Sequence, residues 1–329
     1  MLPTSASLST SIFEDVHCCV CDNTNPSDFK VNYEKETFSV IECVKCSFTF
    51  IPPYFRKKVS YENYKNENVA TAVRNGNNWV KIERHKLRYD LIKKYKPTGS
   101  LFDLGAGWGH FMLTGQMLGY EVYGIEIAEQ PYLYSKNDLK LPVDHIDFFE
   151  MKEDKTFDII TMWDVLEHID KADDVIKKCA RLNSKDGILV IQVPQIDSYF
   201  AKKQKDKWNM MGLDHVNYFG KKTITQLLAK HGYKVETIKS TFEIKLFIMY
   251  SILPLLKRLR GKTKQTQQQA NSSLNSAERQ TYFNTFTQKP LWKLKVYMWV
   301  HNVIYKTLTA LNIGEEMIVV AKKNRKVFS

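Results

Sequence analysis

The sequence predicts an α/β protein with a mostly parallel central sheet, preceded by a small cysteine-bearing module and interrupted near its end by a mostly helical, basic insertion. Three observations predict this: strands and helices alternate from about residue 100 to 193, four cysteines form two close pairs near the N-terminus, and positive charge gathers in residues 245–313. The 329 residues, 43% hydrophobic and 26% charged, suit a globular chain of roughly two domains. A disordered tail protein and a collagen-like fibre are thereby excluded.

The two cysteine pairs have the spacing of a metal site. Cys18-x-x-Cys21 and Cys43-x-x-Cys46 are separated by 21 residues, and the segment between them alternates in the manner of short strands joined by a turn. Such pairs present four thiolates in a tetrahedron, so residues 1–58 are predicted to form a zinc-ribbon-like module. With sulfur at all four positions, the zinc would be structural. The alternative is a set of buried thiols without a metal.

Residues 59–98 are predicted to contain a connector and a first helix. The helix is expected from about Trp79 to Tyr95 and to end at Pro97. Tyr61 and Tyr64, in the connector, are candidates for a lid over a substrate, although surface tyrosines in such a segment are commonplace.

The core is predicted from the strand and helix pattern that begins at residue 100. Short apolar strands are expected at 101–104, 120–127, 141–146, 157–163 and 187–193, and two more at 232–242 and 316–322 as an antiparallel hairpin. Right-handed crossovers between parallel strands bring their carboxyl ends to one edge of the sheet. Loops that follow strands should therefore form the site.

A glycine-rich turn follows the first of these strands, in Asp103-Leu-Gly105-Ala-Gly107-Trp-Gly109. Such turns bind NAD, FAD or S-adenosylmethionine, because glycine lets the backbone approach a ligand closely. Glu126, 21 residues after Gly105, is placed to accept both ribose hydroxyls of any adenosine cofactor. Asp103 lies where a pyrophosphate would sit and would repel it, whereas an ammonium and a sulfonium would be attracted. We therefore expect S-adenosylmethionine.

Several motifs together resemble one family. These are the glycine turn with its aspartate, Glu126, Phe157-Asp158-Ile-Ile-Thr-Met-Trp163-Asp164-Val-Leu-Glu167-His168 and Asp214-His215-Val-Asn-Tyr218-Phe219. Over roughly residues 15–243 the chain resembles class I S-adenosylmethionine-dependent methyltransferases. The subgroup it is most similar to has an N-terminal cysteine zinc module and includes bacterial deoxysugar C-methyltransferases. The long C-terminal segment departs from that pattern.

The resemblance implies a Rossmann-like class I methyltransferase sheet in residues 99–243 and assigns roles within it. It implies that Asp103, Gly105 and Gly107 line the methionine part of the cofactor, that Glu126 holds the ribose, that Asp147 and Phe148 flank the adenine, and that Trp163 and Asp164 close the site.

Two histidines are candidates for catalysis. Methyl transfer to a weakly acidic acceptor needs a base with a pKa near neutrality, which histidine supplies. His215 lies in a loop before a predicted helix and would serve as base or substrate ligand, unless it only holds the loop by a hydrogen bond. His168 begins a loop at the mouth of the predicted site, where the alternative role is a cap or a carboxylate partner.

Residues 244–313 form the basic amphipathic insertion, and residues 314–329 contain the last core strand and a tail. From residue 245 to 313 there are eleven Lys and Arg and one Glu, so this segment holds +10 of the net charge of +12. Residues 246–256 and 291–313 are apolar stretches edged with Lys, Arg and Trp, which suits an anionic membrane surface. The alternative is packing on the domain or on a second subunit.

These observations predict methyl transfer from S-adenosylmethionine to a small molecule, most plausibly a sugar, a lipid-linked glycan or a lipid. Because neither a membrane-spanning apolar segment nor a secretory signal is found, the protein is expected in the cytoplasm. The basic insertion would place it peripherally at the inner face of the membrane. One alternative is an RNA methyltransferase that grips RNA with the zinc ribbon and the basic insertion. Against nucleic acid, the charge is interleaved with aliphatic runs. The other alternative is a non-catalytic, zinc-containing binding protein on a methyltransferase scaffold.

Overall fold

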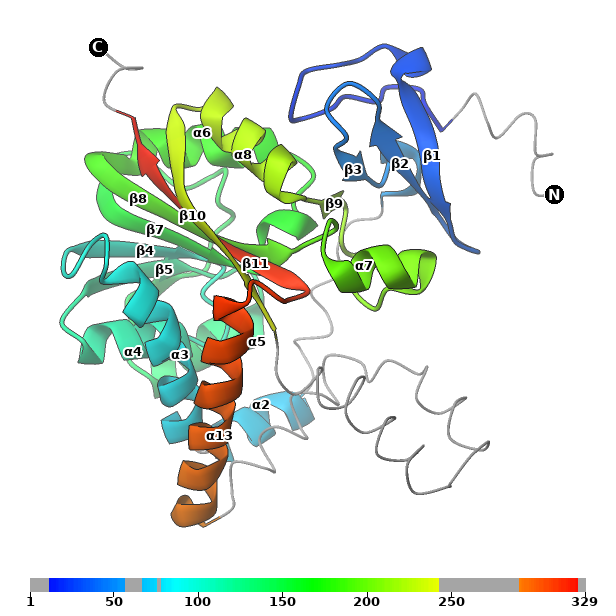
Figure 1. Ribbon diagram of the computed structural model, residues 1–329. Coiled ribbons are helices and arrows are strands. Elements are labelled where there is room, and N and C mark those ends of the chain that lie inside the picture. Colours follow the sequence, from blue (N-terminus) through cyan, green and yellow to red (C-terminus); the bar gives the residue numbers. More distant parts are fainter. Residues whose placement is uncertain (1–11, 57–66, 76–77, 243–289, 325–329) are drawn as a thin grey trace, which may run out of the picture.

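The computed structural model describes residues 12–56, 67–75, 78–242 and 290–324. Tyr61, Tyr64 and the first part of the basic insertion, up to residue 289, lie outside the described residues. Figure 1 shows a large twisted sheet with helices on both faces and a smaller sheet beside it.

The large sheet has seven strands in the order β10-β11-β8-β7-β4-β5-β6. Their bounds are β4 Ser100–Leu104, β5 Glu121–Ile125, β6 Val143–Asp144, β7 Phe157–Trp163, β8 Asn183–Pro194, β10 Tyr233–Thr241 and β11 Glu316–Lys323. The five strands from β8 to β6 are parallel, and β11 runs antiparallel to both β8 and β10. The predicted fold class and the closing hairpin are thereby confirmed.

Helices cover both faces of this sheet because its strands are apolar on both sides. Helices α3 (Asn78–Ile92) and α4 (His110–Met117) lie on one face, and α6 (Ala172–Leu182) and α8 (Lys221–Lys230) on the other (Figure 1). Neighbouring residues of one strand point to opposite faces of the sheet. Leu101 belongs to the core cluster that includes Tyr89 of α3, whereas Phe102 belongs to the cluster that includes residues of α6. Burying each such side chain stabilises the fold by about 1.5–3 kcal/mol.

The order of the strands places a crevice at the carboxyl ends of β4 and β7. The chain passes from β4 to β5 and β6 in one direction and later to β7 and β8 in the other, so the connections diverge between β4 and β7. Ligands of open α/β sheets bind at such a switch point. The glycine turn follows β4, and Asp164 follows β7.

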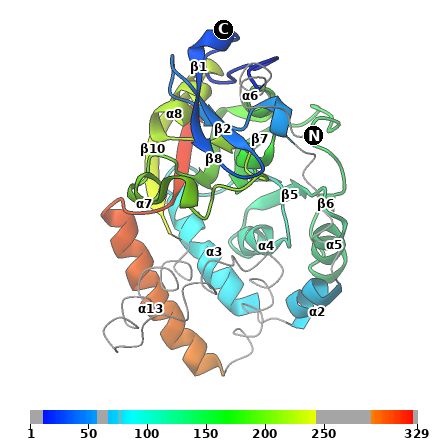
Figure 2. The ribbon, with the colours of Figure 1, turned by 90° about the vertical axis from the view of Figure 1, so that its right-hand side faces the viewer.

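The small sheet combines the cysteine module with a segment of the core. Its strands are β1 (Phe29–Glu34), β2 (Ser39–Cys43), β3 (Thr49–Phe50) and β9 (Asn217–Tyr218), in that order. β1 and β2 confirm the short strands predicted between the cysteine pairs, and β3 follows the second pair. The pairing of β9 with them was not predicted, because β9 lies more than 160 residues further along the chain. Figure 2 shows this sheet in front of β8 and near α7 (Tyr199–Gln204).

Three helices were not foreseen. Helix α2 (Glu67–Asn75) lies within the predicted connector, and its Val69 and Val73 pack against Tyr134. Helices α5 (Glu129–Leu133) and α7 are short, and such pieces have too few turns for a clear periodic signal. The predicted first helix is confirmed as α3, one residue earlier at its start and three residues shorter at its end.

The last part of the basic insertion is helix α13 (Leu291–Ala310), which runs alongside α3 (Figure 1). Its Leu294 and Met298 are buried against Val80 of α3. The predicted apolar stretch extends to residue 313, but Leu311 follows the helix and is 63% exposed. Within the described ranges, no helix is both long and apolar enough to cross a bilayer.

Candidate active site and metal site

The glycine turn connects β4 to α4 in a conformation that favours glycine. Gly105, Gly107 and Gly109 all have positive φ, at +75°, +53° and +72°. A Cβ on Gly105 would lie 2.7 Å from a methyl group of Val165, so only glycine fits there. A Cβ on Gly107 would meet nothing within 4 Å. The space above Gly107 is therefore open to a ligand.

Glu126 closes this turn from the next strand. Its Oε2 accepts a hydrogen bond of 2.6 Å from the Gly107 amide, and its Oε1 one of 2.7 Å from the Ala128 amide. The side chain is buried, which raises its pKa, and the amide hydrogen bonds counteract this. Each oxygen keeps a second acceptor site, so the fixed carboxylate can also bind two hydroxyl groups.

Asp103 lies at the end of β4 and is 1% exposed. Its Oδ1 accepts a hydrogen bond of 2.6 Å from the hydroxyl of Thr161. Burial raises the pKa of Asp103 to about 7. The site thus contains a buried carboxyl that a positively charged ligand would convert to the carboxylate.

Asp147 and Phe148 lie in the segment after β6. Asp147 accepts a hydrogen bond of 2.7 Å from the Phe149 amide, and the Phe148 ring is 5% exposed, stacked 6.1 Å from Phe102. The segment is fastened by Lys178 of α6, whose Nζ donates to the carbonyls of Phe148, Phe149 and Met151 at 2.7, 3.3 and 2.6 Å. The contact of Asp147 and Phe148 with adenine stays a prediction.

Trp163 and Asp164 end β7 on the opposite side of the crevice. The Arg88 guanidinium of α3 lies 4.2 Å above the Trp163 ring and donates to Gln192 Oε1 at 3.1 Å. Gln192 Nε2 in turn donates to both carboxylate oxygens of Asp164, at 3.0 and 3.1 Å. Asp164 has φ +59°, a strained conformation for a residue other than glycine, and such strain gathers at functional sites.

The two predicted histidines are brought together by the fold. Their rings lie 4.7 Å apart, edge to face, although 47 positions separate them in the chain. Nδ1 of His168 lies 2.7 Å from the carbonyl oxygen of Asp214, and Nδ1 of His215 lies 2.7 Å from that of Met210. A carbonyl can only accept, so each Nδ1 carries a proton, and in the neutral ring the lone pair is on Nε2.

Glu167 completes this cluster. A carboxylate oxygen of Glu167 and one ring nitrogen each of His168 and His215 all lie within 4.8 Å of one another. Glu167 is 1% exposed, and its pKa is raised well above the usual range, first by burial and then by the charge of Asp164. The cluster therefore combines two imidazole rings with a buried carboxyl group whose pKa lies above its usual range.

Sequence reasoning missed Lys81 and Arg88, which belong to α3. Lys81 Nζ, Trp163 Nε1 and Glu167 Oε2 are buried polar atoms without a hydrogen-bond partner. Lys81 is 5% exposed, and burial lowers its pKa to about 8. The pKa of neighbouring His110, the residue after the glycine turn, is lowered first by burial and then by the charge of Lys81. Buried polar groups normally have partners, so these three atoms indicate a place for a polar ligand. Nothing in the local pattern of α3 could have identified Lys81 or Arg88.

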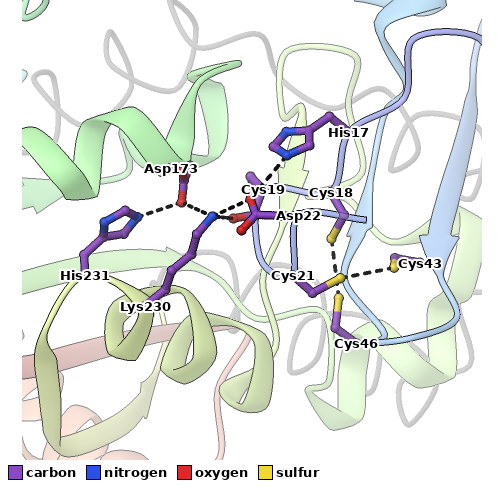
Figure 3. Close-up of polar contacts among 10 residues, drawn as sticks. All are labelled: His17, Cys18, Cys19, Cys21, Asp22, Cys43, Cys46, Asp173, Lys230 and His231. Carbon is purple, nitrogen blue, oxygen red and sulfur yellow. Dashed lines mark hydrogen bonds and ion pairs between the residues drawn. The ribbon is translucent and has the colours of Figure 1, made fainter. Parts of the chain in front are cut away.

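The four cysteines of the predicted metal site converge (Figure 3). All four sulfur atoms lie within 4.8 Å of one another, with 3.4 Å between Cys18 and Cys46 and 3.7 Å between Cys21 and Cys43. Zinc bound tetrahedrally at about 2.3 Å from each sulfur places the sulfurs about 3.8 Å apart. The donor set fits structural zinc, because four thiolates fill all four tetrahedral positions and leave none for water.

Part of the core matches a known family model. Residues 81–238 match the family model described as a methyltransferase domain. The ubiquinone biosynthesis O-methyltransferase of Pelagibacter ubique is 28% identical over 127 residues, which is 35% of this chain and 53% of that protein. The corresponding protein of Rickettsia typhi is 28% identical over 115 residues, 33% of this chain and 45% of that protein. The chain thus spans about half the length of the curated relatives it matches.

The chain also aligns with solved structures, at TM-scores below 0.5. An S-adenosylmethionine-dependent methyltransferase from Archaeoglobus fulgidus has a TM-score of 0.44 and 18% identity, covering 74% of this chain and 93% of that one. Coclaurine N-methyltransferase bound to N-methylheliamine and SAH has a TM-score of 0.41 and 16% identity, covering 74% of this chain and 72% of that one. The domain match and the geometry of the turn support a methyltransferase of the class I, S-adenosylmethionine-dependent kind.

Proposed function

We propose that this chain, whose residues 81–238 form a methyltransferase domain, transfers a methyl group from S-adenosylmethionine to a small-molecule acceptor, most plausibly a sugar, a lipid-linked glycan or a lipid. The observation that carries the proposal is the pairing of the Gly107 amide with Glu126 below an open space, next to a buried Asp103. When bound, S-adenosylmethionine supplies an electrophilic methyl carbon on a positively charged sulfur.

The cofactor would be bound by both negatively and positively charged side chains. Asp103 and the turn at Gly105 and Gly107 would receive the positively charged methionine part, and Glu126 the ribose hydroxyls. Lys81, buried and without a partner beside the start of α4, would pair with the methionine carboxylate. Asp147 and Phe148 would flank the adenine, and Trp163 and Asp164 would close the site, as the sequence predicts.

The acceptor side would be formed by His168 and His215. Each presents an Nε2 lone pair, because each Nδ1–H is engaged by a backbone carbonyl. One Nε2 would take the proton of an acceptor hydroxyl or acidic C–H as the acceptor atom bonds to the methyl carbon and the carbon–sulfur bond breaks. The matched relatives are named for O-methyl transfer, which supports testing a hydroxyl acceptor first.

Calorimetric titration tests the cofactor. We expect micromolar binding of S-adenosylmethionine, no binding of NADH, and loss of binding in Glu126→Ala, since that change removes the acceptor of two amide hydrogen bonds. The exposed Glu129→Ala, three residues away on α5, is the matched control and should bind normally. Binding of NADH alone, or unchanged binding in Glu126→Ala, would contradict the proposal.

Transfer of a tritiated methyl group into fractionated cell extract tests the acceptor. We expect label in the lipid or glycan fraction and its loss in the His168→Ala/His215→Ala protein. Label in the RNA fraction would instead favour an RNA methyltransferase. Binding of the protein to RNA should then weaken steeply as the salt concentration rises. Cofactor binding without transfer to any fraction would favour the scaffold protein.

A second proposal rests on the exposed side of α13. Trp292, Val296, Trp299 and Val303 recur every three to four residues along its outer side and are 48–69% exposed. The helix carries three lysines and no acidic residue, so the stripe is complementary to an anionic lipid surface. We propose that α13 lies peripherally on an anionic membrane, which for a cytoplasmic protein would be the inner face.

Liposome flotation tests this surface. With vesicles of phosphatidylcholine and phosphatidylglycerol, we expect the full chain to float and Trp292→Ser/Trp299→Ser to remain at the bottom. Tyr199→Ser removes an equally exposed aromatic ring from α7 and should float normally. Flotation of the double variant would contradict the assignment, and self-association without flotation would identify the stripe as a contact between copies.

A further inference from the structure

The cysteine module is joined to the core through a shared strand. Thr49 and Phe50 of β3 pair with Tyr218 and Asn217 of β9, and the Ile51 amide donates to the Val216 carbonyl at 2.9 Å. β3 is otherwise paired only with β2 of the ribbon, through Ile41–Phe50 and Glu42–Thr49. Within this small sheet β9 pairs with β3 of the ribbon, and on the core side the next residue, Phe219, forms a bridge with Gln195 and accepts from the Ile196 amide at 3.0 Å.

The same strand is attached to both histidines. His215 immediately precedes Val216, whose amide donates to the carbonyl of Glu167 at 2.8 Å. The side-chain amide of Asn217 donates to the carbonyls of Leu166 and Ile169, at 3.2 and 2.8 Å, and so spans the 3₁₀ turn that carries His168. Asn217 is 2% exposed, so water cannot replace these bonds. A shift of β9 would move the two imidazoles.

A second attachment starts at the metal-binding knuckle itself (Figure 3). Lys230 of α8 contacts Asp22 at 2.6 Å and Asp173 at 2.8 Å, and its Nζ also donates to the carbonyl of Cys19 at 3.3 Å. Nε2 of His231 also lies 2.7 Å from Oδ1 of Asp173. Cys19 and Asp22 flank Cys21, so the knuckle must hold the conformation that its sulfur ligands impose for this bridge to form.

The cofactor turn is secured by local bonds instead. The amides of Gly105 and Ala106 both donate to the Ile125 carbonyl, at 3.1 and 2.9 Å, and Gly107 donates to Glu126. These bonds connect β4 and β5 within the large sheet. They do not depend on the position of β9.

We propose that the metal-loaded ribbon is a positioning element for the acceptor side: through β3, β9 and Asn217 it holds His168 and His215 in their mutual geometry, while cofactor binding is left to the core. The idea deepens the proposed function and rests on it for the role of the histidines. Asn217 and Lys230 act as positioning residues, because they act through the histidine loops.

The test uses the full chain with zinc bound, the same protein after chelation with release of zinc measured, and variants. Asn217→Ala removes the bridge to the 3₁₀ turn, Lys230→Met removes the knuckle bridge, and Lys230→Arg restores its charge. Lys30→Ala, on the outer strand of the ribbon sheet and 58% exposed, is the control. Readouts are calorimetry with S-adenosylmethionine and nitrogen-15 NMR of the histidine rings, assigned with His168→Gln and His215→Gln.

We expect Asn217→Ala to retain zinc and to bind the cofactor within about twofold of wild type, while both rings lose the Nδ1–H tautomer signals. Methyl transfer should fall by ~100-fold, the cost of a misplacement of about 1 Å, in kcat more than in KM. Chelation and Lys230→Met should act in the same direction, and Lys230→Arg should recover the signals.

Unchanged ring signals after chelation and in Asn217→Ala would overturn the proposal. Parallel loss of cofactor affinity and ring signals would overturn it too, since the ribbon would then support the whole domain. If chelation unfolds the chain, Asn217→Ala, with zinc bound, decides alone. If wild type fails to bind S-adenosylmethionine, the proposed function fails, but the ring signals still report whether the ribbon positions the histidines.

Discussion

The two sides of the crevice are built in different ways. On the cofactor side, Asp103, Gly105, Gly107 and Glu126 come from two adjacent strands, and 23 positions separate the first from the last. On the acceptor side, His168 and His215 come from separate loops that are held by a strand paired with the N-terminal ribbon. One side is a local motif, and the other is assembled by the tertiary fold.

This difference predicts separable failures. Changes around the glycine turn should act on cofactor affinity and leave the histidine geometry in place. Changes to the ribbon, β9 or the 3₁₀ turn should slow methyl transfer and leave the affinity for the cofactor unchanged. The predictions that follow would break this separation or make it quantitative.

The largest effect is expected when both histidines are removed. His168→Ala/His215→Ala should slow methyl transfer by about 10²–10⁴, the usual contribution of a general base. Each single change should cost nearly as much as the double change if the two rings act as a unit. Calorimetry should show unchanged cofactor binding, and a matching loss of affinity would show that the two sides are not separable.

The next effect should come from Lys81 on α3. Lys81→Met keeps the length of the buried side chain but removes the charge proposed to pair with the cofactor carboxylate. A hydrogen bond to a charged group contributes about 1.5–3 kcal/mol, so affinity should fall roughly ten- to hundredfold. The melting temperature should rise, because the buried ammonium has no partner. The exposed Lys93→Met is the control, and a stabilised protein with unchanged affinity would remove Lys81 from the site.

The same contrast explains how much the sequence could predict. The glycine turn, Glu126 and the seven strands were recognisable because each depends on spacing within a short stretch. The four cysteines were recognisable for the same reason. The pairing of β9 with β3 was not, since two residues of strand carry no periodic signal and their partner lies far away in the chain. Even so, His168 and His215 could be chosen by their chemistry before their proximity was known.

Helix packing was the other part that the sequence did not define. The periodic pattern of residues 291–313 indicated a helix but did not distinguish its two apolar stripes. In the structure Leu294 and Met298 are buried on α3, whereas Trp292 and Trp299 are exposed. Which stripe is buried depends on the position of α3, and that position is set by the sheet beneath it.

A smaller effect should appear in the pH dependence of cofactor binding. The pKa of Asp103 is about 7, so its carboxyl is mostly protonated below that pH. A positively charged ligand prefers the ionised form, so below pH 8, where Lys81 keeps its proton, affinity should rise with pH through 7 and fall by up to tenfold per unit below it. Calorimetry from pH 5.5 to 8.5 measures the slope. Asp103→Asn should abolish it, and an equal slope in that variant would assign the titration to another group.

The smallest effect is expected at Lys178, which supports the segment predicted to contact the adenine. Lys178 Nζ donates to three carbonyls of the segment that contains Phe148 and follows Asp147. Lys178→Met should loosen that segment and weaken binding of S-adenosylmethionine by roughly three- to tenfold, since ordering a loop on binding costs about 1 kcal/mol per immobilised residue. The neighbouring Lys177→Met, on the exposed side of α6, should bind normally. Because Lys178 supports only the adenine end, methyl transfer at saturating cofactor should keep its wild-type rate; a lower rate at saturation would mean that disorder on the cofactor side reaches the histidines.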